Sequence, residues 1–179
     1  MPPETSIRSL FLTGAAGRLE ALLNAGSPTA THAAVVCHPH PLYGGTLHNK
    51  VVFHAMKALH SFGFPVLRFN FRGTGLSEGE HANGVGEVED VRAADRMDDS
   101  VYDFSFLRDC PKPKLFVSGS RDQFAPSGKL EALVNTFADP KKLVRIEAGD
   151  HFFEGRLKEM RAAIEDWLSG IVAAPTAGG

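Results

Sequence analysis

The sequence predicts an α/β fold: a three-layer α/β/α sandwich with a mostly parallel sheet and an N-terminal antiparallel hairpin. Short apolar runs of strand length alternate with amphipathic runs of helix length from residue 33 to residue 170. This alternation is typical of parallel strands joined by helical crossovers. Ahead of it, two strand-like runs flank a Gly-Ala-Ala-Gly turn at residues 14–17, a pattern that indicates a β-hairpin.

The first half of the chain divides into recognisable elements. The hairpin strands are predicted at residues 7–13 and 18–24, and the first buried strand at residues 33–37, a run of small apolar residues. Asn49 can cap the helix that follows, and Gly63 ends it. The apolar residues of that helix, spaced for one buried face, are Val51, Val52, Ala55, Met56 and Leu59.

The second half continues the alternation. A second buried strand is predicted at residues 65–71, and a helix at residues 87–99 opens with acidic residues, which the helix dipole favours there. Residues 100–113 read as irregular. A third buried strand (114–118), a helix marked by Leu130, Leu133, Val134 and Phe137, a short strand (143–146) and a helix marked by Leu157, Met160, Ile164, Trp167 and Leu168 complete the chain.

We therefore expect one domain over residues 1–179, with its core at about residues 6–172 and flexible ends. The sheet should have about six strands, with residues 33–37 next to residues 114–118. A strand from another copy inserted between these two would instead make the protein a dimer.

Composition excludes several classes of partner. The net charge of −2 gives no basic surface for nucleic acid, and no apolar run is long enough to cross a membrane. The two cysteines, Cys37 and Cys110, suit a reducing compartment. The N-terminal residues lack the pattern of a secretory signal, so we expect a cytoplasmic protein.

Polar residues follow the ends of four predicted strands: His38 and His40, Arg72, Asp122, and His151. In open α/β folds, ligands bind at the carboxyl ends of the strands. We therefore expect these four loops to meet at one edge of the sheet and to form a site there.

Four stretches carry a family resemblance: residues 38–45 (HPHPLYGG), 68–79 (RFNFRGTGLSEG), 119–122 (GSRD) and 149–153 (GDHFF). In this order they resemble the α/β-hydrolase superfamily, specifically its compact lidless branch related to dienelactone-hydrolase-like esterases. The resemblance implies hydrolase chemistry of the serine esterase type, on a small ester or thioester, with no cofactor and no metal.

The resemblance also assigns roles to residues. The first loop is expected to supply an oxyanion-hole donor, and because Pro39 and Pro41 have no N–H, the donor must be His40 or Leu42. Asp122 matches the acid of the catalytic triad. His151 matches its base, an imidazole that the acid holds in one tautomer so that the other nitrogen takes the serine proton.

The nucleophile of this family is missing from its expected place. It lies in a G-x-S-x-G turn between a strand and a helix. The interval from residue 87 to residue 114 contains no such turn and is too short for a βαβ unit of about 30 residues. We infer that the strand, the turn, the helix and the next strand are absent as a block.

Three other residues are weaker nucleophile candidates. Ser77 lies in the literal motif GLSEG, but no strand is predicted to enter it and no helix to follow it, so we expect a decoy. Ser105 lacks the flanking glycines. Cys37 is expected to lie inside a strand as a small hydrophobe.

Three other functions compete with this one. A phosphate loop built from Gly73, Gly75 and Gly79 lacks a following helix N-terminus. A zinc site built from His38, His40 and His48 lacks a carboxylate or thiolate at ligand spacing. The serious rival is a non-catalytic scaffold or interaction protein on the hydrolase fold. The sequence thus predicts an esterase-type protein that keeps its acid and base, binds an ester-like ligand and lacks a nucleophile.

Overall fold

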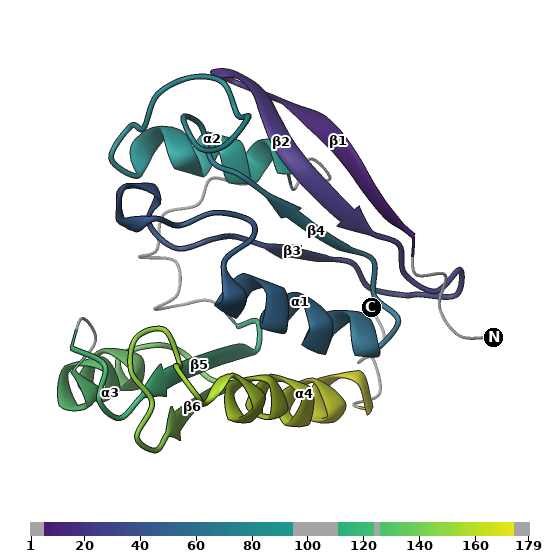
Figure 1. Cartoon of the computed structure of the whole chain (residues 1–179). Coiled ribbons are helices and arrows are strands. Elements are labelled where there is room, and N and C mark those ends of the chain that lie inside the picture. The colour runs from purple at the N-terminus through teal and green to yellow at the C-terminus, as the bar shows by residue number, and fades with distance from the viewer. Residues whose placement is uncertain (1–5, 95–110, 124–125, 174–179) are drawn as a thin grey trace. The chain divides into compact units, whose positions relative to one another are not determined.

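The computed structural model describes residues 6–94, 111–123 and 126–173 of the chain. It has an α/β architecture whose contacts group into two compact units, residues 1–101 and residues 102–179 (Figure 1). The single domain predicted from the sequence stays a prediction. Each helix of the described residues falls short of the length and apolarity that a membrane span requires.

The first unit contains a four-stranded sheet. Its strands are β1 (Ile7–Gly14), β2 (Gly17–Asn24), β4 (Val66–Phe69) and β3 (Ala34–Val36), in that spatial order. β2 runs antiparallel to β1 and to β4, whereas β3 and β4 are parallel. Only β2 therefore opposes the common direction, and the predicted N-terminal hairpin is confirmed.

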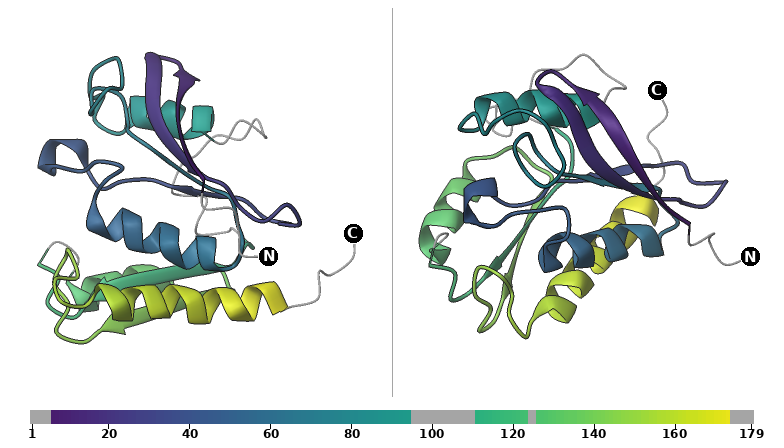
Figure 2. Two further views of the ribbon diagram at one scale, coloured as in Figure 1. Left: turned by 45° about the vertical axis from the view of Figure 1, so that its right-hand side comes forward. Right: turned by 45° about the horizontal axis from the view of Figure 1, so that its top comes forward.

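Two helices cover this sheet from opposite sides, α1 (Lys50–Ser61) and α2 (Val85–Ala94) (Figures 1 and 2). The core on the α2 side contains Leu19, Ala21, Phe69 and Phe71, with Leu10, Leu12, Leu67, Val91, Ala93 and Ala94 packed against it. The strand residues of this set alternate along each strand, so they share one face of the sheet, and Val91, Ala93 and Ala94 come from α2. α1 covers the other face, where the Arg68 guanidinium lies 5.9 Å from the Phe53 ring.

The predicted boundaries of α1 are confirmed. The Asn49 side chain accepts a hydrogen bond of 2.8 Å from the N–H of Val51, which satisfies one of the free donors of the first turn. Gly63, with φ of +79°, follows the last turn in a conformation that favours glycine. The buried residues of the helix are Val52, Met56 and Ala58.

The second unit is a β-α-β-α segment. β5 (Lys114–Gly119) and β6 (Lys141–Ile146) are parallel, and α3 (Ser127–Asn135) and α4 (Leu157–Ala173) lie on either side of them in the right-hand view of Figure 2. The Phe116 and Phe137 rings stack with centroids 5.6 Å apart. The predicted strand at residues 143–146 begins two residues earlier, at Lys141.

The structure corrects two predictions. Within the described residues, hydrogen bonds join the strands of the first unit into a four-stranded sheet and those of the second unit into a two-stranded sheet, and the single sheet with residues 33–37 beside residues 114–118 stays a prediction. The ladder of β3 covers only Ala34–Val36, which is a short edge for holding a further strand. Val35 is 36% exposed and is therefore not buried on both faces. Cys37 lies beyond the strand and is exposed rather than buried.

Candidate active site

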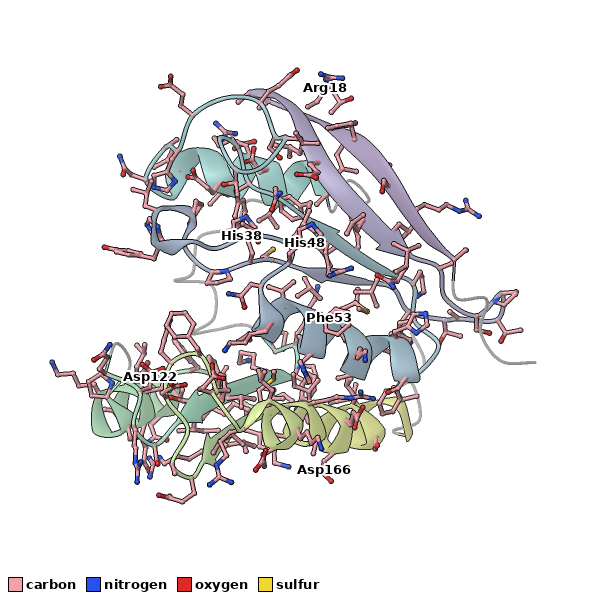
Figure 3. All side chains as sticks on the ribbon, viewed as in Figure 1. Arg18, His38, His48, Phe53, Asp122 and Asp166 are labelled. Atoms are coloured by element: carbon pink, nitrogen blue, oxygen red, sulfur yellow. The ribbon has the colours of Figure 1, made fainter. Side chains whose placement is uncertain are left out.

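The loop that follows β3 begins with a buried histidine, His38 (Figure 3). Its Nε2 accepts a hydrogen bond of 3.0 Å from the N–H of Phe71, and its Nδ1 lies 2.6 Å from the carbonyl oxygen of Pro39. Burial lowers the pKa of His38, although the Pro39 carbonyl opposes this shift. The neutral tautomer with a proton on Nδ1 satisfies both partners, so His38 ties this loop to the end of β4.

The far end of the same loop is held by Arg68 of β4 and by Asn70, which directly follows β4. The N–H of Leu47 donates to the Asn70 side-chain oxygen at 2.7 Å, and Arg68 donates to the carbonyl oxygen of Leu47 at 3.2 Å. The Asn70 amide in turn donates to Glu20 at 2.7 Å. Asn70 and Arg68 therefore hold the N–H and the carbonyl group of Leu47, which is buried.

His40 and Leu42, the two predicted oxyanion donors, lie in the middle of this loop, where Pro41–Tyr43 form a 3₁₀ turn, η1. The N–H of Leu42 donates to the His40 imidazole at 3.3 Å. The N–H of His40 has no hydrogen-bond partner in the part of the chain that the structure describes. The role of either N–H as an oxyanion-hole donor stays a prediction.

A glycine makes this tight loop possible. A Cβ at Gly45 would lie 1.9 Å from the carbonyl oxygen of Pro39, which no side chain tolerates. The carbonyl oxygen of His40 also accepts hydrogen bonds from the N–H groups of Tyr43 and Gly45. The backbone around His40 is thus closed on itself.

Ser77 lies in the loop after β4, buried and fully hydrogen bonded. Its hydroxyl donates to the carbonyl oxygen of Asn70 at 2.8 Å and accepts from the N–H of Glu20 at 2.9 Å. No strand leads into Gly75, and the next helix, α2, begins only at Val85. A triad serine instead gives its proton to an imidazole, so this is the environment of a structural serine.

The loops after β3 and β4 meet in the first unit. The His40 and His81 rings lie with centroids 4.9 Å apart, and His81 Nδ1 lies 2.8 Å from a carboxylate oxygen of Glu87. Arg72, the polar residue predicted at this edge, pairs with Asp90 at 2.7 Å. Arg72 therefore stabilises the start of the loop instead of facing a ligand.

Glu87 predicts a measurable dependence of stability on pH. Burial alone would raise its pKa, but hydrogen bonds from the N–H groups of Ala82 (2.8 Å) and Gly84 (2.7 Å), together with His81, lower it. A lowered pKa stabilises the fold above the ordinary value of 4.5, and this stabilisation is lost as pH falls through the folded-state pKa. We expect Glu87→Gln to lower the unfolding free energy at neutral pH, and we expect the difference from wild type to shrink in acid.

Urea titrations of both proteins at about pH 7 and pH 3.5 measure this difference in unfolding free energy. A difference that does not change with pH would contradict the lowered pKa of Glu87.

Asp122 and His151 are brought together in the second unit, as predicted. The His151 Nδ1 lies 3.1 and 3.2 Å from the two carboxylate oxygens of Asp122. The Asp122 side chain is 7% exposed and the His151 side chain 38% exposed. A buried carboxylate on Nδ1 fixes the tautomer that leaves Nε2 as the basic nitrogen. Figure 3 shows Asp122 beyond the end of β5.

The loops that carry this pair touch through two glycines. A Cβ on Gly119 would lie 2.1 Å from the carbonyl oxygen of Gly149. The N–H of Arg121 donates to the same oxygen at 2.8 Å. Ala148 and Phe153 adopt φ values of +56° and +52°, which are uncommon for residues other than glycine. The His151 loop is therefore tightly wound and held against the Asp122 loop.

Several other sequence predictions can be placed. His48 is exposed, and His38 uses both ring nitrogens on backbone partners. Among the described residues, no group of three His, Cys, Asp or Glu side chains has an arrangement that fits a metal ion. Ser105 and Cys110 lie outside the described residues. The roles of His81 and Glu87 were not predicted, and the one available signal was an acid three residues after Gly84 at a helix start.

Known proteins resemble the chain in sequence and in structure. No protein-family model matches the chain. The uncharacterized protein RP471 of Rickettsia prowazekii (strain Madrid E) is 33% identical, with 89% of this chain and 87% of that protein covered. The alignment runs over 209 residues, more than the 179 of the chain, so RP471 has residues with no counterpart here.

Two solved structures are similar over nearly the whole chain. A structure of an alpha-beta serine hydrolase homologue from Coxiella burnetii has a TM-score of 0.80 and 31% identity, covering 90% of this chain and 97% of its own. An a/b serine hydrolase without lid from Xanthomonas campestris has a TM-score of 0.79 and 27% identity, covering 96% and 98%. Both structures therefore share the fold of this chain.

Proposed function

Because the chain belongs to the α/β-hydrolase superfamily, we propose that it is a cytoplasmic protein of the serine ester-hydrolase type that has kept its acid and base and lost its nucleophile. The acid is Asp122 and the base is His151. In this proposal the chain binds a small ester or thioester, in the manner of the dienelactone-hydrolase-like branch. It hydrolyses such a ligand weakly at most, because the imidazole has only water to activate.

The observation that carries the proposal is the contact of His151 Nδ1 with both oxygens of the buried Asp122 carboxylate. This arrangement holds an imidazole ready to accept a proton. Two further observations support the missing nucleophile. The Ser77 proton is donated to a backbone carbonyl, and RP471 has residues that this chain lacks. We assign those residues to the strand–turn–helix segment of the family.

The second candidate is a non-catalytic scaffold or interaction protein on the same fold. The environment of Ser77 favours it, since both hydrogen-bonding directions of the hydroxyl are used by the backbone of the first unit. The two candidates differ in what His151 does. Only the first predicts ester turnover that depends on its imidazole.

Labelling with a fluorophosphonate tests the absence of a nucleophile. These reagents react with serines that are activated by a base, so we expect no stoichiometric adduct on the purified protein by intact-mass spectrometry. A serine esterase in the same reaction serves as the positive control, and Ser77→Ala serves as the matched variant. One adduct per chain, mapped by peptide sequencing to Ser77 or Ser105, would overturn the proposal.

A further inference from the structure

We propose that Ser120 is a positioning residue whose hydroxyl fixes the His151 loop against the Asp122 loop; this inference rests on the proposed function of that pair. Ser120 lies at the end of β5, two residues before Asp122. Its hydroxyl contacts the turn that leads from β6 to His151.

Two hydrogen bonds define the direction of that hydroxyl. Its oxygen accepts from the N–H of Ala148 at 2.9 Å, and its proton is directed at a Glu147 carboxylate oxygen at 3.2 Å. A carboxylate can only accept, so the serine proton points to Glu147 and a lone pair faces Ala148. Glu147 thus orients Ser120, and Ser120 holds the turn.

Ser120 holds Ala148, whose backbone is strained. Ala148 adopts a φ of +56°, where an alanine Cβ crowds the backbone. Such a conformation persists only where surrounding contacts impose it. The Ser120 oxygen binds the N–H of this residue, and the next residue, Gly149, accepts from Arg121. The chain then reverses and reaches His151 two residues later.

The Asp122–His151 contact is sensitive to this support. Its distances of 3.1 and 3.2 Å exceed the 2.7–2.9 Å or so of the strongest charge-assisted hydrogen bonds. A displacement of the His151 loop that lengthens them further weakens this contact. The backbone bonds of Ser120 and Arg121 to Ile146 and Gly149 do not involve the hydroxyl. Removing the hydroxyl should loosen the turn without unpairing β5 from β6.

The test is nuclear magnetic resonance of the resting protein, which needs no substrate. The signal is the His151 Nδ1 proton, assigned by its loss in His151→Gln. In Ser120→Ala we expect this proton to exchange with water about tenfold faster, the factor that corresponds to one lost hydrogen bond. Ser120→Thr, which keeps a hydroxyl, should retain the slow exchange.

Controls separate positioning from a general loss of stability. Ser169→Ala removes an exposed hydroxyl of the same unit, which donates to the Glu165 carbonyl oxygen at 2.9 Å, and should leave the His151 proton unchanged. Circular dichroism should show all variants folded. Exchange in Ser120→Ala within about twofold of wild type, or equal acceleration in Ser169→Ala, would overturn the role of Ser120 and leave the proposed function intact. A His151 proton that ignores Asp122→Asn would remove the pair itself, and both proposals with it.

Discussion

Replacing Asp90 with Asn is expected to lower the unfolding free energy of the protein by about 3–5 kcal/mol, the usual cost of leaving one member of a buried ion pair without its partner. Asp90 is 0% exposed. Its carboxylate accepts from the Arg72 side chain at 2.7 and 3.1 Å and from the Arg72 N–H at 2.9 Å. The side-chain hydrogen bond to Asp90 raises the pKa of Arg72. An arginine stays charged without such a partner as well, so in the variant the guanidinium keeps its charge and loses its counter-charge.

Urea titration followed by circular dichroism measures this loss. Arg18→Ala is the matched control in the same unit, because the Arg18–Glu78 pair has a similar distance of 3.0 Å but is largely exposed. Water and salt screen such a pair, so the control should change stability only slightly. Equal effects of the two substitutions would show that the buried pair contributes no more than a surface one.

The boundaries of α1 show which features the sequence predicts well. Asn49 caps the start of α1 by accepting a hydrogen bond from the N–H of Val51, and Gly63 follows the end of the helix in a left-handed conformation. Both residues act on groups within one helical turn. Such effects depend on local sequence and do not need the rest of the fold. The adjacency of Asp122 and His151 was also predictable, because the carboxyl ends of neighbouring parallel strands meet at one edge.

The strand at residues 33–37 shows where sequence reasoning fails. Its apolar residues are typical of a strand covered on both faces, yet Val35 and Cys37 are exposed. Burial of a strand depends on which segments lie beside it. The residues of the strand carry no record of which segments lie beside it, so their composition alone does not predict their exposure.

The hydrogen bonds and ring contacts among the polar residues of the first unit were also not predictable from the sequence. Ser77 forms part of a G-x-S-x-G motif, but its hydroxyl accepts a hydrogen bond from the N–H of Glu20, which is 57 positions away in the chain. His81 reads as a loop residue, and only the folded structure places its ring against that of His40. Contacts of this kind are set by tertiary packing, which periodicity does not encode.

Hydrolysis of a p-nitrophenyl acetate-type ester is expected to proceed at a rate on the order of 10⁶ below that of a complete serine triad. In such enzymes, loss of the serine leaves a residual catalysis that rests on the oxyanion hole. In this family one of the two donors of that hole is the N–H that follows the nucleophile. Under the proposed function the chain lacks both the nucleophile and this N–H, and its imidazole acts on water alone. The release of p-nitrophenolate, corrected for the buffer rate, measures this.

Three variants decide between weak catalysis and a scaffold. If His151 activates water, His151→Ala abolishes the residual rate and Ser77→Ala leaves it unchanged, because the Ser77 proton is held by the Asn70 carbonyl. Asp122→Asn should lower the rate as well, since an amide no longer holds the tautomer with Nε2 as the base. A rate at background in all of them favours the scaffold. Rapid turnover that Ser77→Ala abolishes would instead make that serine a true nucleophile, and the pair of hydrogen bonds that now bury its hydroxyl would have to break during every catalytic cycle.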